Sequence, residues 1–586
     1  MHDLLEKMGK NIIEQESPTK FGGRSRLRFH KDVEYVLTNN KGTDKITGIM
    51  LNFPQKSYEI FLNVGRSFSK MKNLKILMNY NVCGDPSYIP NNLRVLDWKR
   101  RASRSWPANF SPKALVFNLP YSCIKQIGDG LQYLKKLTSL NFKRSEFLTE
   151  ILDLSSRPDI RYLNANGCTS LVEVHPSVGY LDKLEGLDFC YCCELAKFPN
   201  KVRLKSLEFF LLNGCIKLES FPKIVDKMES LIELDLGRTA IKELPASIGH
   251  MIGLEILRLS ESAIKELPAS IGNLIGLKEL SLSESAIKEL PAPIEHLTAL
   301  EKLNFTRTAI QKLPSSFGNF NALKELWLGG TAIEELSSSS GNLTGLKGLN
   351  LQGCENLANL PQSIYGLQNL GITSFGGSNQ CKQSHDGDFE RPGVMYFEEC
   401  NASNIDSLEN FCCWSNLTII NLSKSDFVSI LVCISKCVNL WELNLRGCKR
   451  LEEILGKFPA SIARIDMADC VSLERFSTLS KILEDEDMQG ISDMDSNCHR
   501  LCDNLRLDVS KMAKVLLNQV TYLSFIYIIN MHIVSLLKEF FGHSFRLRRR
   551  ATTKSLTGLN GKGWIVVFAL LTSNQPIDRP SKHWWT

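Results

Sequence analysis

The sequence predicts an α/β solenoid, because one unit of 23 residues recurs through the centre of the chain. A representative unit, LIELDLGRTAIKELPASIGHMIG, covers residues 231–253. Its first six residues alternate apolar and polar side chains, the pattern of a strand with one buried face. Pro245 interrupts the returning segment, and Gly249 is expected to allow a tight bend toward the next strand. Six successive units begin at Leu231, Leu254, Leu277, Leu300, Leu323 and Leu346.

A period of about 20–29 residues with the pattern L-x-x-L-x-L is typical of a leucine-rich-repeat solenoid, a horseshoe of stacked units. A single unit cannot bury its own apolar face, so neighbouring units share a continuous core. We expect about sixteen repeats of about 21–24 residues over residues 70–475. Outside the regular stretch, further strands are expected to begin near Leu93, Ala114, Leu137, Ile160, Leu184, Leu207, Leu370, Leu417, Leu440 and Ile462.

The segments that flank the repeats differ from them. Residues 1–69 are expected to be a short helical remnant of another module followed by a linker. Residues 476–586 form a divergent C-terminal tail, irregular, disordered or helical. Two alternatives are open for residues 376–416: a degraded repeat near Val394 (VMYFEEC), or an inserted polar loop.

The ninth position of the repeat holds only serine, threonine or cysteine. The chain turns sharply after each strand and leaves backbone groups without a sheet partner. A short side chain can bond these groups inside the stack, where an unpaired polar group costs about 1–3 kcal/mol. We expect an internal structural ladder, which continues at Ser378 and Ser425 and consists mainly of Ser122, Ser145, Cys168, Cys192, Cys215, Thr239, Ser262, Ser285, Thr308, Thr331, Cys354, Cys448 and Cys470.

Composition narrows the possible partners. The net charge is +7, and basic residues gather at 20–31 (KFGGRSRLRFHK) and 546–550 (RLRRR). Such segments could contact nucleic acid or anionic lipid, serve in targeting, or be solvated. No aromatic residues are interleaved on an extended basic face, so nucleic-acid binding is not expected.

Cysteine usage and hydropathy indicate a reducing compartment. The opening residues, MHDLLEKMGK, have no apolar core of a secretory leader, so we expect reduced thiols in the cytoplasm or the nucleus. The 18 cysteines show no metal-ligand spacing, so no metal is expected. Residues 515–537 are apolar over a bilayer length, but Asn518, Gln519, Asn530 and His532 disfavour membrane spanning and favour a buried or amphipathic helix.

The concave sheet is the expected binding surface, because the residues between the leucines project from it. Their charges are mixed in sign, which favours a protein partner over nucleic acid. Trp327 is singled out because tryptophan is a favoured interface anchor. The other candidates are Phe209, Leu211, Arg238, Ile256, Arg258 and Arg307. No motif of a catalytic nucleophile, base or metal occurs, so no enzymatic activity is expected.

Several segments resemble plant intracellular immune receptors of the TIR-type nucleotide-binding leucine-rich-repeat class. Residues 1–4 (MHDL) and 24–49 (RSRLRFHKDVEYVLTNNKGTDKITGI) resemble the end of the nucleotide-binding module and its entry into the repeats. The segments LRVLDWKR at 93–100 and LVFNLPYSCIKQI at 115–127 resemble the first repeats. The strand endings NGC, at 166–168 and 213–215, and TAIKELP resemble the repeat signature of that family.

The resemblance implies a function and also marks what is missing. In that family the histidine of the MHD motif reads the nucleotide phosphate, so His2 and Asp3 would be the corresponding residues. The sequence has no phosphate-binding G-x-x-x-x-G-K-[ST] loop, so ADP or ATP is expected only in a full-length relative. We therefore expect a receptor fragment, a truncated paralogue or an incomplete gene model.

By the same resemblance, the repeats would recognise a pathogen effector or a guarded host protein and restrain receptor signalling. The alternative is an intracellular repeat scaffold that bridges signalling proteins without a nucleotide switch. The MHDL segment separates the two, because a pure scaffold has no use for it. An extracellular receptor is disfavoured by the absence of a leader.

Overall fold

The computed structural model describes residues 3–53, 65–81, 88–101, 116–126, 136–357, 360–370, 372–375, 393–397, 415, 417–430, 432–455, 457–477, 490–492 and 501. All of these lie in the first of two compact units, Met1–Lys511. The apolar segment at 515–537, the basic segment at 546–550, His2 and Ser378 lie outside the described residues. Among those described, no helix has both the length and the apolar character needed to cross a bilayer.

One parallel sheet of 21 short strands runs through the described residues. Each strand pairs in parallel with the strand of the next repeat, so that Glu233 lies opposite Ile256, and Ile256 opposite Glu279. The sheet contains β1 (Arg26–Leu27), β2 (Gly48–Leu51), β3 (Ile76–Asn79), β4 (Val95–Trp98), β5 (Val116–Asn118), β6 (Ser139–Asn141), β8 (Tyr162–Asn164), β10 (Gly186–Asp188), β12 (Phe209–Leu211), β14 (Glu233–Asp235), β15 (Ile256–Arg258), β16 (Glu279–Ser281), β17 (Lys302–Asn304), β18 (Glu325–Trp327), β19 (Gly348–Asn350), β20 (Ile372–Phe375), β21 (Val394–Phe397), β22 (Ile419–Asn421), β24 (Glu442–Asn444), β26 (Arg464–Asp466) and β28 (Gly490–Ser492). This stack is the expected leucine-rich-repeat solenoid, and that prediction is confirmed.

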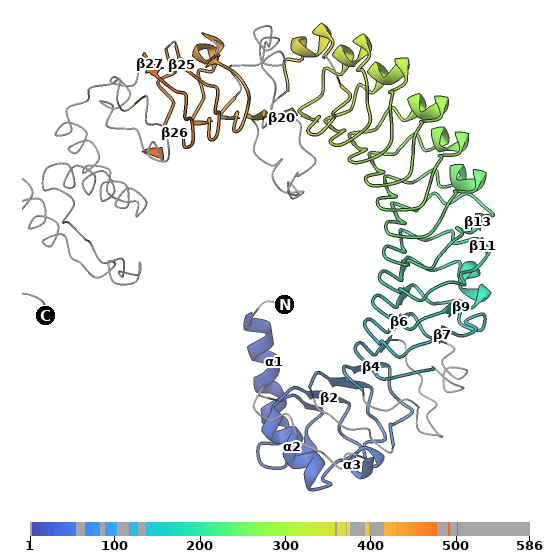
Figure 1. Cartoon of the computed structure of the whole chain (residues 1–586). Coiled ribbons are helices and arrows are strands. Elements are labelled where there is room, and N and C mark those ends of the chain that lie inside the picture. Colours follow the sequence, from blue (N-terminus) through green and yellow to red (C-terminus); the bar gives the residue numbers. More distant parts are fainter. Residues whose placement is uncertain are drawn as a thin grey trace, which may run out of the picture. The chain divides into compact units, whose positions relative to one another are not determined.

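The strands line the inner side of the curved stack formed by residues 136–357, and short 3-10 helices line its outer side (Figure 1). The outer side also carries shorter strands. The 3-10 helices are η3 (Pro176–Tyr180), η4 (Ala246–His250), η5 (Ala269–Asn273), η6 (Ala292–His296), η7 (Ser315–Asn319), η8 (Ser338–Asn342), η9 (Gln362–Gly366) and η13 (Val432–Lys436). The outer strands are β7 (Glu150–Ile151), β9 (Glu173–Val174), β11 (Lys201–Val202), β13 (Lys223–Ile224), β23 (Ser429–Ile430), β25 (Glu453–Ile454) and β27 (Arg475–Phe476).

The leucines of the pattern form the core between these two sides. In the repeat that begins at Leu231, the side chains of Leu231, Leu234 and Leu236 are fully buried, and Ile241 and Ile248 meet them from the returning segment. The strand residues on either side of Leu234 remain partly exposed. This alternation fixes which side chains a strand presents on the concave face.

The 3-10 helix η4 stacks so closely on η5 that only glycine fits at position 249. Pro245 immediately precedes η4 in an extended conformation, with φ of −66°. A Cβ atom on Gly249 would lie 2.8 Å from the carbonyl oxygen of Ser270 in the next 3-10 helix. Gly249 was expected to supply a tight bend; the structure instead places it where neighbouring repeats approach each other.

The sheet begins earlier than the expected boundary at residue 70. Strands β1 and β2 pair with each other, and β2 pairs with β3, so residues 26–51 already belong to the sheet. The repeat pattern did not reveal them, because neither strand carries L-x-x-L-x-L. Helices α1 (Asp3–Glu16), α2 (His30–Thr38) and α3 (Gly65–Ser69) and the 3-10 helix η1 (Phe21–Gly23) accompany these strands.

The sheet also continues through and beyond the irregular C-terminal part. Strand β21 pairs with both β20 and β22, so a degraded repeat is present near Val394. Strand β28 pairs with β26, which carries the sheet past the expected boundary at residue 475. With β1, β2, β3, β21 and β28 included, the sheet has 21 strands, more than the expected number of about sixteen repeats.

Candidate partner-binding surface

Two groups of repeats differ in how their ninth residue bonds. The cysteine repeats (residues 160–230) contain Cys168, Cys192 and Cys215 at this position. The Cys192 thiol donates to the carbonyl oxygen of Ala165, 3.1 Å away in the preceding repeat. Ser145 and the other ladder cysteines also donate to the preceding repeat: Cys168, Cys215, Cys354, Cys448 and Cys470.

The serine/threonine repeats (residues 231–345) use the same position differently. The Thr308 hydroxyl donates to the carbonyl oxygen of Phe305 at 2.8 Å, within its own repeat. The side chains of Thr239, Ser262 and Thr331 make the corresponding bond. Two buried ladder hydroxyls, those of Ser122 and Ser285, donate to no partner among the described residues, so the expected bond is missing there.

Burial keeps the cysteine thiols protonated. Their enclosure in the stack raises the pKa of Cys168 to about 12 and that of Cys215 to about 12. The pKa values of Cys192 and Cys354 are raised for the same reason. A protonated thiol can donate a hydrogen bond but is a poor nucleophile, which suits these cysteines to the bonds of the stack.

A second recurring contact lies at the fifth position of the repeat, on the concave face. There an asparagine or aspartate oxygen accepts a hydrogen bond from the backbone N–H two residues later, which closes the turn after the strand. These side chains are visible in the sequence, but the repeat pattern predicted a bond only at the ninth position and not that the fifth position closes the turn. This contact is made by Asn141, Asn164, Asp188, Asp235, Asn304, Asn350, Asn421, Asn444 and Asp466.

Three predicted binding residues occupy this fifth position in repeats that lack the turn contact. Leu211, Arg258 and Trp327 lie at the ends of β12, β15 and β18. All three side chains are half-buried, as is Ile256 at the start of β15. Because these side chains do not close the turn, their chemistry can vary without loss of the repeat geometry.

The three predicted arginines are held by ion pairs within the solenoid. Arg258 contacts Glu233 of the preceding repeat and, at 3.1 Å, Glu279 of the following one. Arg238 lies 2.7 Å from Glu261, and Arg307 lies 2.9 Å from Glu284.

Arg238 and Arg307 also lie outside the strands. Both occupy the turn that follows a strand, with φ of 54° and 56°. They were expected on the strand face, and the structure places them on its rim. Both are exposed there, but their charges already have partners.

Exposed apolar side chains gather on the cysteine repeats and at the start of the repeat that follows them. Phe209 is 39% exposed on β12, and Tyr162 is 51% exposed on β8, two strands away. Ile232, just before β14, is 37% exposed, and Tyr191 on the rim is 50% exposed. Phe209 was predicted from the sequence, whereas Tyr162, Tyr191 and Ile232 were missed, because no repeated motif marks them.

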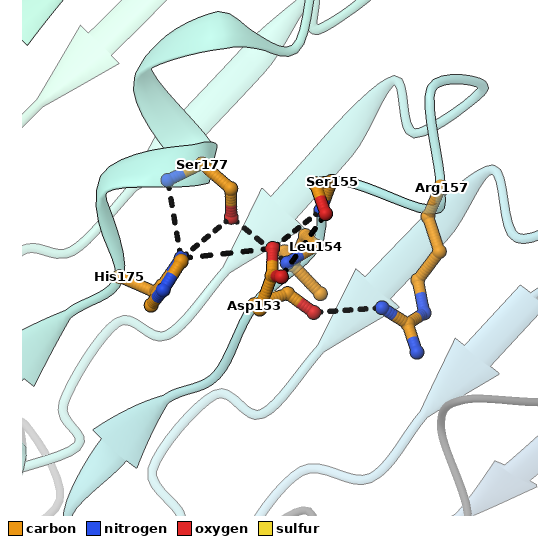
Figure 2. A network of polar contacts seen from close by, with 6 residues as sticks. All are labelled: Asp153, Leu154, Ser155, Arg157, His175 and Ser177. Atoms are coloured by element: carbon orange, nitrogen blue, oxygen red, sulfur yellow. Dashed lines mark hydrogen bonds and ion pairs between the residues drawn. The ribbon is translucent and has the colours of Figure 1, made fainter.

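Ser177, His175 and Asp153 lie together near η3 and superficially suggest a catalytic relay (Figure 2). Such a relay requires serine at one ring nitrogen and the carboxylate at the other. Here both approach Nδ1: the Ser177 hydroxyl at 3.0 Å and the Asp153 carboxylate at 3.6 Å. The Ser177 oxygen also accepts the backbone N–H of Leu154 at 2.8 Å.

The cluster around Asp153 is a structural cap for η3. His175 Nδ1 accepts the backbone N–H of Ser177, and the carboxylate of Asp153 accepts hydrogen bonds from Ser155. These bonds, above all the one from the backbone N–H of Ser155, lower the pKa of Asp153. Arg157 donates to the carbonyl oxygen of Asp153 at 2.7 Å. The geometry is therefore that of a set of structural hydrogen bonds that connects two neighbouring repeats.

No group of metal-ligating side chains occurs within the described ranges. Asp3, one of the two residues assigned to the MHD motif, is the first residue of α1.

Together, the parallel sheet, the 23-residue register and the inner ladder define a leucine-rich-repeat protein with an accessible concave face. A family model described as "Disease resistance protein RPS4B-like, leucine-rich repeats" matches residues 203–262 and 296–496. The repeat region is therefore similar to the leucine-rich repeats of plant disease resistance proteins, in agreement with the resemblance found in the sequence.

Curated relatives agree with this assignment. Disease resistance protein RPP2A of Arabidopsis thaliana is 34% identical over 240 residues, which are 39% of this chain and 18% of the relative. TMV resistance protein N of Nicotiana glutinosa is 33% identical over 243 residues, 40% of this chain and 20% of the relative. Disease resistance protein RPS6 of Arabidopsis thaliana is 33% identical over 253 residues, 41% of this chain and 22% of the relative. The chain spans about a fifth of the length of these relatives.

Proposed function

We propose that this chain is the recognition part of a plant immune receptor, and that its concave face binds a protein: a pathogen effector or a host protein that an effector modifies. The observation that carries the proposal is the exposed apolar surface of Tyr162, Phe209 and Ile232, of which Phe209 and Ile232 lie in the segment that matches disease-resistance repeats. Aromatic side chains that are exposed on a rigid sheet are favoured anchors of protein interfaces. The capping geometry of Ser177, His175 and Asp153 does not support a catalytic relay at that cluster, which agrees with a binding role.

The second part of the proposal is that the unoccupied repeats restrain the receptor's signalling module. Helix α1 presents Met8 and Ile12 to solvent, 53% and 59% exposed and four residues apart. Side chains at this spacing lie on one face of a helix, which makes that face a suitable contact for a neighbouring module. Binding of a partner on the concave face would then shift the receptor between restrained and released states. In a full-length receptor, ADP or ATP would be bound by the nucleotide-binding module.

The recognition step is tested by proximity labelling in leaf tissue that expresses the full chain, with and without infection. We expect a labelled protein whose enrichment falls at least about fivefold in a Phe209→Ala variant. Ile275→Ala is the matched control, because Ile275 is 63% exposed but follows η5 at the end of its repeat and lies outside the strands. Equal enrichment in the two variants would contradict recognition through the concave face.

The restraint step needs a separate measurement. The chain is co-expressed with the signalling modules of a disease resistance relative that lacks its own repeats, and cell death is scored. Suppression by the chain, and its loss in a Met8→Ser/Ile12→Ser variant, is the expected result. A labelled partner without any effect on cell death would favour the alternative, an intracellular scaffold. Fractionation of the same tissue tests the proposed location in the cytoplasm or nucleus.

A further inference from the structure

The concave face changes character between the two groups of repeats. In the serine/threonine repeats, carboxylates are matched by cations one repeat away. Glu255 lies 2.8 Å from Lys278, and Glu301 lies 2.7 Å from Lys324. The strand residues Lys302 and Glu325 pair at 3.1 Å, and Arg258 joins two glutamates. This surface satisfies its own charges.

The cysteine repeats also contain an ion pair between repeats, Arg161 with Glu185 at 2.6 Å, but in these repeats and the strand that follows them three half-buried carboxylates form no such pair. Within the described part of the chain, Asp188, Glu208 and Asp235 form no ion pair. The hydrogen bonds that Asp188 accepts come from the amides of Asn164 and Asn166 and from a backbone N–H. Asp235 accepts from the Asn213 amide and a backbone N–H. Neutral donors hold the carboxylates of Asp188 and Asp235 in place. Arg258 lies opposite Asp235 in the sheet register and attracts it, but Arg258 also pairs with Glu233 and Glu279, so the group of carboxylates keeps a net negative charge.

The three carboxylates surround the exposed apolar side chains. In the sheet register, Leu211 lies between Asp188 and Asp235. Glu208 directly precedes Phe209, and its carbonyl oxygen accepts the backbone N–H of Ile232 at 2.9 Å. The charge of Glu208 also contributes to the raised pKa of Tyr162, after the nearer Glu185. Acidic and apolar groups therefore share one surface.

We infer that this surface, the acidic–aromatic patch formed by Tyr162, Asp188, Glu208, Phe209, Ile232 and Asp235, binds an extended basic segment of the protein partner. Cationic side chains would pair with the three carboxylates, and arginine or lysine can also lie over the aromatic rings. An apolar residue between them would contact Phe209. The inference rests on the proposed recognition function and specifies the chemistry of the partner.

The sheet also sets the spacing of the expected cations. Asp188 and Asp235 lie two strands apart, roughly 10 Å at the usual spacing between neighbouring strands. An extended chain covers this distance in about three residues. The partner segment is therefore expected to carry arginine or lysine about every third residue, with an apolar side chain between them.

The test measures binding of a fluorescein-labelled peptide, Arg-Ala-Leu-Arg-Ala-Leu-Arg, to the full chain by fluorescence anisotropy. The peptide in which glutamate replaces each arginine is expected not to bind. The informative variant is Glu208→Gln/Asp235→Asn, which removes two negative charges. The amide oxygen that this variant introduces can still accept the two hydrogen bonds that Asp235 Oδ1 accepts, so the turn is expected to remain intact. We expect the dissociation constant to rise by about tenfold.

The matched control is Glu255→Gln/Glu301→Gln. It removes the same charge from carboxylates that are already paired with lysines of the next repeat. We expect a change of less than about twofold in affinity, since the control leaves the patch intact. Equal weakening in both double variants would show attraction to overall charge and would overturn the inference, as would equal binding of the acidic peptide. Thermal melting of each variant checks that it remains folded.

The outcomes separate this inference from the proposed function. If the peptide fails to bind but Phe209→Ala still abolishes labelling of a partner in leaf tissue, recognition stands and the basic chemistry is wrong. If Phe209→Ala leaves labelling unchanged while the peptide binds at the patch, the acidic–aromatic patch is a binding site but not the recognition surface of the receptor.

Discussion

The cysteine repeats and the serine/threonine repeats share one backbone plan but distribute their bonds differently. In the cysteine repeats the ladder side chain bonds the repeat before it, whereas in the serine/threonine repeats it bonds its own turn. On the concave face, a series of ion pairs connects the serine/threonine repeats. The cysteine repeats contain the Arg161–Glu185 pair but leave other carboxylates and aromatic rings exposed or half-buried without an ion-pair partner among the described residues. Surface ion pairs therefore join adjacent repeats in both regions, and ladder bonds inside the stack join them in addition in the cysteine repeats. The region with these inner bonds is also the one that carries most of the acidic–aromatic patch.

The largest expected effect concerns the outer side of the serine/threonine repeats. A Cβ on Gly272 would lie 2.5 Å from the carbonyl oxygen of Pro293, so Gly272→Ala must separate η5 from η6. We expect a loss of about 2–3 kcal/mol in the free energy of unfolding, measured by urea denaturation. Gly276→Ala is the control, because its nearest neighbour would be 3.9 Å away, and it should change stability by less than about 0.5 kcal/mol. Equal effects would mean that the 3-10 helices do not determine how these repeats stack.

The second prediction tests the two ladders directly. Cys192→Ala and Ser262→Ala each remove a single γ atom from a buried ladder position. Cys192→Ala should lower the free energy of unfolding by about 2 kcal/mol and Ser262→Ala by about 1 kcal/mol. Only Cys192→Ala breaks a bond between repeats, so it alone should reduce the dependence of the unfolding free energy on urea. A reduced slope in both variants would remove the distinction between the ladders.

The third prediction concerns the ion pairs on the concave face. Arg258→Met leaves Glu233 and Glu279, which lie in the repeats before and after it, without the cation between them. We expect a loss of about 1 kcal/mol in the free energy of unfolding at low salt, and a smaller loss in about 1 M sodium chloride. A loss that does not depend on salt would show that packing of the side chain, and not its charge, joins these repeats.

The smallest effect is expected at Asp97, which occupies the fifth position of an early repeat. Burial raises the pKa of this carboxyl, and its Oδ1 has no hydrogen-bond partner among the described residues. Because its pKa is higher in the folded state than in the unfolded state, its contribution to stability decreases as the pH rises through that range. Asp97→Asn should therefore be more stable than the native chain at about pH 7, by less than about 1 kcal/mol, and the difference should disappear below about pH 4. Thermal unfolding at neutral pH, and at a pH below the ordinary aspartate pKa, measures this difference in stability. If the variant were less stable than the native chain at neutral pH, burial of the charged carboxylate would not be destabilising as we expect.

The repeat itself could be predicted from the sequence because burial repeats with it. Leu231, Leu234 and Leu236 are identifiable as core residues from their spacing alone, and the short ladder residues follow from the same register. The bonds of the ladder could not be predicted, since Cys192 and Thr308 occupy the same position and reach carbonyls of different repeats. That choice depends on the rotamer that the surrounding packing permits.

The candidate surface was predictable only in part. Phe209 and Trp327 were found because large apolar residues interrupt polar strand positions. The pairing of Arg258 with glutamates 25 residues before it and 21 after it requires the strand register, which places equivalent positions side by side. Strands β1 and β2 were missed because sheet pairing, and not a leucine pattern, makes them part of the solenoid.

The reactivity of the ladder cysteines can also be used to measure how often neighbouring repeats separate. Cys168, Cys192 and Cys215 lie in consecutive repeats, fully buried, while Cys193 beside them is partly exposed. Iodoacetamide can alkylate a ladder sulfur only after two neighbouring repeats have separated. The alkylation rate of Cys193 serves as the reference for an accessible thiol. Mass spectrometry of alkylated peptides would then give the opening rate of each junction separately. Comparison of these rates with and without a bound partner would show which junctions between repeats open less often when the partner binds.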